Sequence, residues 1–222
     1  MTAASLPIAI TLGDVAGIGP EIIVKAFRDS PAQMLNCVVI GDVAAMQRAV
    51  DVLAQLQPHA PHVDVLPVTQ LSAFSHMRSP MCMPVLQVSQ ALSAEQLPAW
   101  GRISAVAGKL AADSVVWAAN AALRGEVASL VTAPLHKEAL SAAGVPFPGH
   151  TEMLQACAAL HAGVAVDDMP VRMMLANPEL RTVLVSIHVS LRDAIDAVTV
   201  ENVLQTLRIT HHAQLAASGR AP

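Results

Sequence analysis

Two titratable side chains flank a pair of tight turns in the middle of the chain. Lys137 begins a short helical pattern, and a second turn, Pro146–Gly149, is followed directly by His150 and Thr151. Gly and Pro at this spacing favour turns, and turns after a strand can hold polar groups in place. A lysine and a histidine brought together in this way could bind an anionic substrate.

Each of these residues also has a simpler interpretation. Lys137 lies early in its helical pattern, where a lysine is commonly a solvated charge. His150 could be a loop histidine that bonds to the backbone. Alternatively, it lies at a helix N-terminus that Thr151 caps and that attracts anions. The residue types alone leave these alternatives open.

A glycine-rich segment, Gly13–Pro20, lies between a short apolar run and a helical pattern. Strand, glycine-rich turn and helix are the context of a phosphate-binding loop. The segment lacks the spacing of the known nucleotide-binding motifs, and Pro20 removes one amide donor. A nucleotide-binding module is therefore disfavoured, while anion binding and a tight turn remain alternatives. Asp14 receives no role.

The strands and helices that would position these residues alternate along the chain. Buried apolar runs are typical of parallel strands, and the runs here are separated by amphipathic helical patterns, the second of which Asp42 can cap. Strands are expected at 7–12 and 37–40, and helices at 20–30 and 44–56. This order predicts a parallel α/β layer.

Five prolines interrupt residues 57–90, and we expect a surface excursion there with one strand at 63–66. The later elements follow from helical spacing and from short apolar runs. We expect a hairpin because the link between the last two strands is too short for a parallel crossover. These elements are a helix at 104–123, a strand at 127–131, helices at 137–143 and 150–160, strands at 171–175 and 182–186, and a helix from 201 that Thr199 caps.

His188 is expected to close the last of these strands. Imidazole is the commonest metal ligand, but one histidine does not make a metal site. His211 and His212 are neighbours on a predicted helix and would point about 100° apart, so they do not readily chelate one metal together.

The composition excludes several classes of protein. The 222 residues are 54% hydrophobic and 14% charged, with a net charge of −4. No basic block indicates a nucleic-acid surface, no apolar run reaches the roughly 18 residues of a membrane helix, and the N-terminus lacks a signal-peptide pattern. Three widely spaced cysteines fit reduced thiols. We therefore expect a cytoplasmic protein with no nucleic-acid or membrane partner.

Three long segments resemble the 4-hydroxythreonine-4-phosphate dehydrogenase family, in the order found there. They read ITLGDVAGIGPEIIVKA, VTAPLHKEALSAAGVPFPGHTEML and VRMMLANPELRTVLVSIHVSLRDAIDAVT. Close relatives in the family act on 4-phospho-D-threonate or 4-phospho-D-erythronate, and a more distant branch oxidises cis-dihydrodiols.

The resemblance implies a fold and an assembly. The fold is α/β, with two α/β/α domains around a cleft, similar to the isocitrate and isopropylmalate dehydrogenases. Residues 1–134 would form an incomplete first domain, and residues 135–222 would form part of the second. The assembly implied is a homodimer whose active sites lie at the subunit interface.

The resemblance also implies a reaction. NAD (or NADP) accepts hydride from a phosphorylated 3-hydroxy acid, a divalent metal (zinc, magnesium or cobalt) binds the reacting oxygen, and the product loses CO2. The default substrate is 4-phosphohydroxy-L-threonine, which gives 3-amino-2-oxopropyl phosphate in pyridoxal phosphate (vitamin B6) biosynthesis. By motif position, His150 and Thr151 contact substrate, and His188 is a metal ligand. Lys137 helps to hold the substrate anion or lines the cleft. Catalytic and cofactor-binding residues stay unassigned.

Family members continue beyond the final helix with segments that resemble NPHAGEGG and YHDQG, which carry two further metal histidines. These are missing from the 222 residues, so we expect no turnover by this chain, as a fragment or as the product of a truncated or split gene. Two alternatives stay open. One is a 4-phospho-D-threonate or 4-phospho-D-erythronate dehydrogenase. The other is an inactive fragment that binds a small anion or pairs with an intact subunit.

Overall fold

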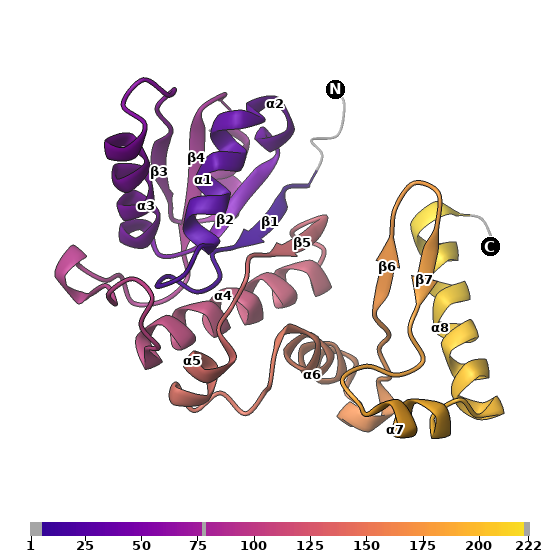
Figure 1. Ribbon diagram of the computed structural model, residues 1–222. Helices are drawn as coiled ribbons and strands as arrows, with labels where there is room; N and C mark the ends of the chain where they lie inside the picture. The colour runs from indigo at the N-terminus through magenta and orange to yellow at the C-terminus, as the bar shows by residue number, and fades with distance from the viewer. Residues whose placement is uncertain (1–5, 77–78, 220–222) are drawn as a thin grey trace. The chain divides into compact units, whose positions relative to one another are not determined.

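The computed structural model describes residues 6–76 and 79–219 (Figure 1). They form two compact units, of which the first ends at Val166 and the second begins at Asp167. Residues 1–5, on which the expected absence of a signal peptide partly rests, lie outside the described residues. No helix in the described part of the chain has the length and apolar character needed to cross a membrane.

The first unit contains a five-stranded parallel sheet in the order β3–β4–β2–β1–β5. In register, Ile10 lies between Val39 on one side and Val131 on the other. The predicted parallel α/β layer is therefore confirmed. The strands are β1 (Ile8–Thr11), β2 (Cys37–Gly41), β3 (Asp64–Val68), β4 (Cys82–Gln87) and β5 (Ser129–Thr132).

Helices cover both faces of this sheet. One cluster joins Ile10 to Phe27 and Met46, and a second joins Ala9 to Ala118. The first cluster places α1 and α3 on one face, and the second places α4 on the other. The helices and 3-10 turns of this unit are α1 (Gly19–Asp29), α2 (Pro31–Met34), α3 (Val43–Leu56), η1 (Leu71–His76), η2 (Ala94–Gln96), α4 (Ala105–Leu123), α5 (Lys137–Ala142) and α6 (His150–Ala162), and η3 (Val166–Asp168) spans the boundary.

The strand expected at 63–66 is confirmed as β3. The surface excursion expected for the rest of 57–90 is wrong, because β4 lies there. This segment supplies two sheet strands, β3 and β4, and β4 lies in the interior of the sheet between β3 and β2. Pro84 is buried within β4, opposite Leu66. Proline cannot donate to a ladder and ordinarily marks an edge or a break, which is why the sequence argued against a central strand.

Helices α5 and α6 pack on α4. Leu140 of α5 and Met153 of α6 share a buried cluster with Val115 of α4. A Cβ at Gly108 would lie 1.9 Å from the carbonyl oxygen of Ala139, so only glycine allows α4 and α5 to approach this closely. These contacts place residues 135–166 with the first unit, whereas the division predicted from the sequence falls at residue 134. The domains 1–134 and 135–222 stay a prediction.

The second unit combines a two-stranded antiparallel hairpin with two helices (Figure 1). The predicted hairpin is confirmed, and Thr199 caps the last helix as predicted, because its side chain accepts a hydrogen bond from the Asn202 amide. The elements are β6 (Met174–Ala176), β7 (Arg181–Val183), α7 (Leu191–Asp196) and α8 (Val200–Ser218).

Candidate functional site

The carboxyl ends of β1 and β5 meet where the strand order changes direction. The strand that follows β1 in the chain, β2, lies on one side of β1, and β5 lies on the other side. In parallel α/β sheets this switch point is the usual place for a ligand. Here the Asp14 amide donates to the Pro134 carbonyl at 2.8 Å. A Cβ at Gly13, whose φ is +71°, would lie 2.4 Å from the same oxygen. Two sequence motifs that are far apart in the chain are thus in direct backbone contact.

The glycine-rich turn uses its own amides. The Ala16 amide donates to the Asp14 carboxylate at 2.9 Å, and the Gly17 amide donates to the Asp14 carbonyl at 3.1 Å. A phosphate loop instead points several free amides at its ligand. The structure therefore favours the tight turn over the phosphate loop, and it gives Asp14 a structural role within that turn.

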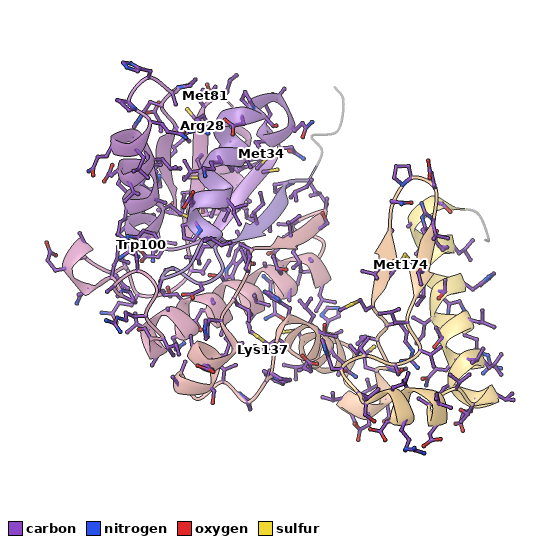
Figure 2. All side chains as sticks on the ribbon, in the orientation of Figure 1. Arg28, Met34, Met81, Trp100, Lys137 and Met174 are labelled. Carbon is purple, nitrogen blue, oxygen red and sulfur yellow. The ribbon has the colours of Figure 1, made fainter. Side chains whose placement is uncertain are left out.

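Arg48, which no sequence motif marks, joins this turn to a distant loop. Its guanidinium donates to the carbonyls of Val15 and Pro98, both at 2.7 Å, and lies 4.1 Å from the centre of the Trp100 ring (labelled in Figure 2). Burial lowers the pKa of Arg48, but arginine stays charged. The contact is a cation–π interaction combined with two charge-assisted hydrogen bonds.

Asp42 and Gln87 organise the neighbouring strand ends. The Asp42 carboxylate caps α3 by accepting from the Ala45 amide, and it also accepts from Gln87 Nε2 at 2.9 Å and from the Leu92 amide at 3.1 Å. An acid after the second strand of a dinucleotide-binding fold often holds a ribose. Here the carboxylate is fully buried and already has three donors, so its role is to fix the loop after β4.

Lys137 is the first residue of α5, and its side chain is exposed (Figure 2). Among the described residues it forms no ion pair. Neighbouring His136 is the N-cap of α5, but its side chain does not cap the helix. Lys137 is therefore available to an anion, as the functional interpretation requires, although a solvated lysine would look the same.

His150 opens α6, and Gly149 is the N-cap. Thr151 is thus the second helical residue, so the expectation that it caps the helix is wrong: the chain is already helical one residue earlier. No side chain caps α6, and the Nε2 atom of His150 is buried without a hydrogen-bond partner in the described structure. Burial lowers the pKa of His150 from its ordinary value of 6.5. The imidazole is therefore neutral near pH 7, and its Nε2 atom is available to a ligand.

His188 lies in the second unit, in the loop between β7 and α7. The expectation that it closes a strand is wrong, because β7 ends at Val183. Its side chain is exposed and its φ is +57°, a left-handed conformation that is uncommon for residues other than glycine. Nowhere in the described ranges do three or more His, Cys, Asp or Glu side chains gather as a metal site would require.

Helices α5 and α6 both pack on α4, and Lys137 and His150 are the first residues of these two helices. His150, Thr151 and Lys137 belong to the first unit, and His188 belongs to the second. A hollow of about 510 Å³ also borders α4 and α5. It is lined by other residues, among them Ser89, Gln90, Val106, Lys109, Asp113 and Ala142.

Comparison with known proteins gives one consistent family. Residues 33–221 match the family described as pyridoxal phosphate biosynthetic protein PdxA. A 4-hydroxythreonine-4-phosphate dehydrogenase from Beijerinckia indica is 41% identical over 92% of this chain and 55% of its own length. A D-threonate 4-phosphate dehydrogenase from Salmonella typhimurium is 34% identical over 88% of this chain and 55% of its own length.

Solved structures of proteins in the same family superpose well on this chain. A 4-hydroxythreonine-4-phosphate dehydrogenase from Klebsiella pneumoniae superposes with a TM-score of 0.80 at 30% identity, over 99% of this chain and 61% of that one. The corresponding protein from Burkholderia phymatum gives 0.78 at 30% identity, over 97% and 60%. The predicted fold class is confirmed, and the chain spans a little over half the length of the curated relatives it matches.

Proposed function

Because the chain belongs to the family of the pyridoxal phosphate biosynthetic protein PdxA, we propose that it supplies substrate-binding residues to a dehydrogenase of a phosphorylated hydroxy acid. The preferred substrate is 4-phosphohydroxy-L-threonine, oxidised at its hydroxyl with NAD or NADP as hydride acceptor and then decarboxylated. The product would enter pyridoxal phosphate biosynthesis.

The observation that carries this proposal is the start of α6. A buried ring nitrogen without a partner is costly to leave unpaired, and a ligand hydroxyl or carboxylate removes that cost. The His150 Nε2 atom is such a group, and it lies at a helix N-terminus that no side chain caps. The free amides and the helix dipole there favour an anionic ligand. Thr151, one residue further along, would add a hydroxyl to the same site.

Lys137 would complete the binding of the substrate anion. It starts α5, which packs on α4 as α6 does, and it is a free cation within the described structure. Lysine binds phosphate as a point charge on a flexible stem. The assignment therefore needs only that the ammonium reach the substrate, and it requires no fixed geometry.

The described residues do not suffice for the metal and the cofactor that the resemblance implies. A catalytic metal ordinarily needs three protein ligands, and His188 is one exposed histidine with no other candidate ligand gathered around it in the described ranges. In the Gly13–Pro20 turn, the amides of Ala16 and Gly17 donate to Asp14, so they are not free to bind the phosphates of a dinucleotide. The role that this chain's residues support is thus binding and orienting substrate, and we expect binding without turnover.

A second candidate substrate is 4-phospho-D-threonate or its erythronate counterpart. The D-threonate 4-phosphate dehydrogenase from Salmonella typhimurium is 34% identical to this chain, so the family relationship accommodates both. The two substrate classes share a terminal phosphate, a carboxylate and an oxidisable hydroxyl, and they differ in carrying an amino or a hydroxyl group at C2. Titration of the chain with both compounds would rank them.

Calorimetric titration with 4-phosphohydroxy-L-threonine tests the proposal. Replacing His150 with Ala should weaken binding by roughly tenfold to a hundredfold, because a hydrogen bond to a charged ligand is lost. His161→Ala changes an exposed histidine in the last turn of the same helix and should leave binding unchanged. Absence of binding by the wild-type chain, or equal losses in both variants, would refute the assignment. Reduction of NAD with added zinc, followed in parallel, should show no turnover, and robust turnover would contradict that expectation.

A further inference from the structure

Glu152 is a half-buried carboxylate in the first turn of α6. It is the third residue of the helix and follows His150 by two positions. It forms no ion pair with any described residue. A charged group that is partly removed from water gains most from a partner of opposite charge. The carboxylate is therefore available to a cationic group of a ligand.

His150 and Glu152 flank Gly149 at the start of α6. Successive helical residues are roughly 100° apart around the axis, so His150 and Glu152 point to different sides of the helix. The N-cap position of Gly149 lies between them, roughly 100° from His150 and roughly 60° from Glu152. A ligand that lies over Gly149 thus has one of these side chains on each flank.

The space over Gly149 is open. Apart from its chain neighbours, a Cβ atom at Gly149 would have one atom of the described structure within 4 Å, the Oε2 atom of Glu152 at 3.6 Å. The first amides of α6 have no partner within the helix, and they project toward the same end. The Glu152 carboxylate therefore borders a space from which a ligand can reach these amides.

A carboxylate at this place is unfavourable for a ligand that carries only negative charge. The amides and the positive end of the helix dipole attract an anion, whereas the Glu152 carboxylate repels it. A zwitterion avoids this conflict, because its ammonium group can pair with the carboxylate while its anionic groups bind elsewhere in the site. Of the two candidate substrates, 4-phosphohydroxy-L-threonine carries an ammonium group at C2, and 4-phospho-D-threonate carries a hydroxyl there.

We propose that Glu152 determines specificity at C2, by pairing its carboxylate with the ammonium group of a substrate that lies over Gly149. A hydroxyl at C2 can also donate to the carboxylate, so the hydroxy acid is accepted but lacks the charge attraction. This inference rests on the proposed function and deepens it, because it names the residue that distinguishes an amino acid from a hydroxy acid.

Glu152 also has a purely structural interpretation. An acid in the first turn of a helix stabilises it through the dipole, whatever the ligand. In that case Glu152→Gln should lower the stability of the chain slightly and change the affinity for both compounds alike. The ratio of the two affinities therefore separates specificity from stability.

Calorimetric titration with both compounds measures this ratio. The wild type should bind 4-phosphohydroxy-L-threonine about tenfold more tightly than 4-phospho-D-threonate, since one charge-assisted interaction differs between them. Glu152→Gln keeps the shape and removes the charge. It should weaken binding of the amino acid by about tenfold and bring the two affinities close to each other.

Two further variants serve as controls. Glu201→Gln makes the same change at an exposed position in the first turn of α8 and should leave both affinities unchanged. Gly149→Ala places a methyl group in the open space, at an ordinary contact distance from Glu152, and should weaken both compounds alike. Unchanged affinities in Gly149→Ala would mean that the ligand does not lie over this residue and would overturn the proposal. Circular dichroism checks that each variant is folded.

His150→Ala distinguishes a failure of this inference from a failure of the proposed function. A wild type that binds neither compound would refute both. If His150→Ala weakens both compounds, while Glu152→Gln changes neither affinity or lowers both equally, His150 stays a binding residue and the role of Glu152 is refuted. A wild type without preference for the amino acid would refute that role as well.

Discussion

His150 combines two features that rarely persist in a protein without a ligand. Its Nε2 atom is buried and unpaired, and burial lowers the pKa of the ring from 6.5. Both features disfavour the charged imidazolium inside the folded chain. The neutral ring is therefore part of the native state, and its protonation must be linked to stability.

The linkage gives a pH prediction. As pH falls below about 6.5, the unfolded chain binds a proton at His150 while the folded chain does not, so the free energy of unfolding declines until pH passes below the lowered native pKa. Urea unfolding of the wild type and of His150→Asn between about pH 8 and about pH 5 measures this. The decline should be shallower in the variant. His161→Asn, at an exposed position, should retain the wild-type slope, and equal slopes in all three proteins would contradict the linkage.

Arg48 shows why some of the site could not be read from the sequence. Its two acceptor carbonyls and its aromatic partner come from turns that meet only after the sheet has formed. One arginine among the apolar residues of a helix carries no pattern that indicates such contacts. Sequence motifs, by contrast, point to His150, Thr151, Lys137 and His188 as binding residues. The roles of these four residues stay proposals.

At the scale of helices and turns, the confirmed predictions depend on hydrogen bonds between residues that are close in sequence. Asp42 and Thr199 cap helices with their own side chains, and the Asn177 side chain accepts from the amides of Glu179 and Leu180 in the hairpin turn. These interactions join residues two or three apart, so residue type and spacing suffice to predict them.

The failures at this scale arise where tertiary structure overrides a local rule. Pro84 is tolerated in an interior strand because it is paired in register only with Leu66 of β3, and the pairing of β4 with β2 begins after it, at Val85. The end of β7 at Val183 was missed because the apolar residues continue beyond it to Ile187. Helix α7, only six residues long, gave too short a pattern to be recognised.

The contact between α4 and α5 leads to a prediction at this scale. Gly108→Ala should destabilise the chain by roughly 1–3 kcal/mol, although alanine is the better helix former by about 1 kcal/mol. The added methyl would lie 1.9 Å from a backbone oxygen of Ala139, which no side-chain rotation relieves. Urea unfolding measures the change. Ala105→Met enlarges an exposed position in the first turn of the same helix and should be near neutral. A Gly108→Ala chain as stable as the wild type would mean that α5 can move away freely.

The same substitution links packing to the proposed site. Lys137 begins α5, so a displaced α5 moves the ammonium group relative to His150. A loss of substrate affinity in Gly108→Ala, without such a loss in Ala105→Met, would connect this helix contact to binding.

At the scale of the whole molecule, the two units differ in how they are stabilised. The first has a sheet covered on both faces, with buried clusters that include Ile10, Phe27 and Ala118. The second has a hairpin and two helices without a buried apolar side chain among its described residues. Apolar burial is the main favourable term in folding, so the second unit should open far more readily than the first.

Hydrogen exchange followed by mass spectrometry tests this difference. Peptides from β1, β2 and β4 should be the slowest to exchange, with a protection that approaches the global free energy of unfolding. Peptides from β6, β7 and α7 should exchange through local opening at much lower free energy. Uniform protection across both units would show that the second unit is stabilised by contacts other than its own.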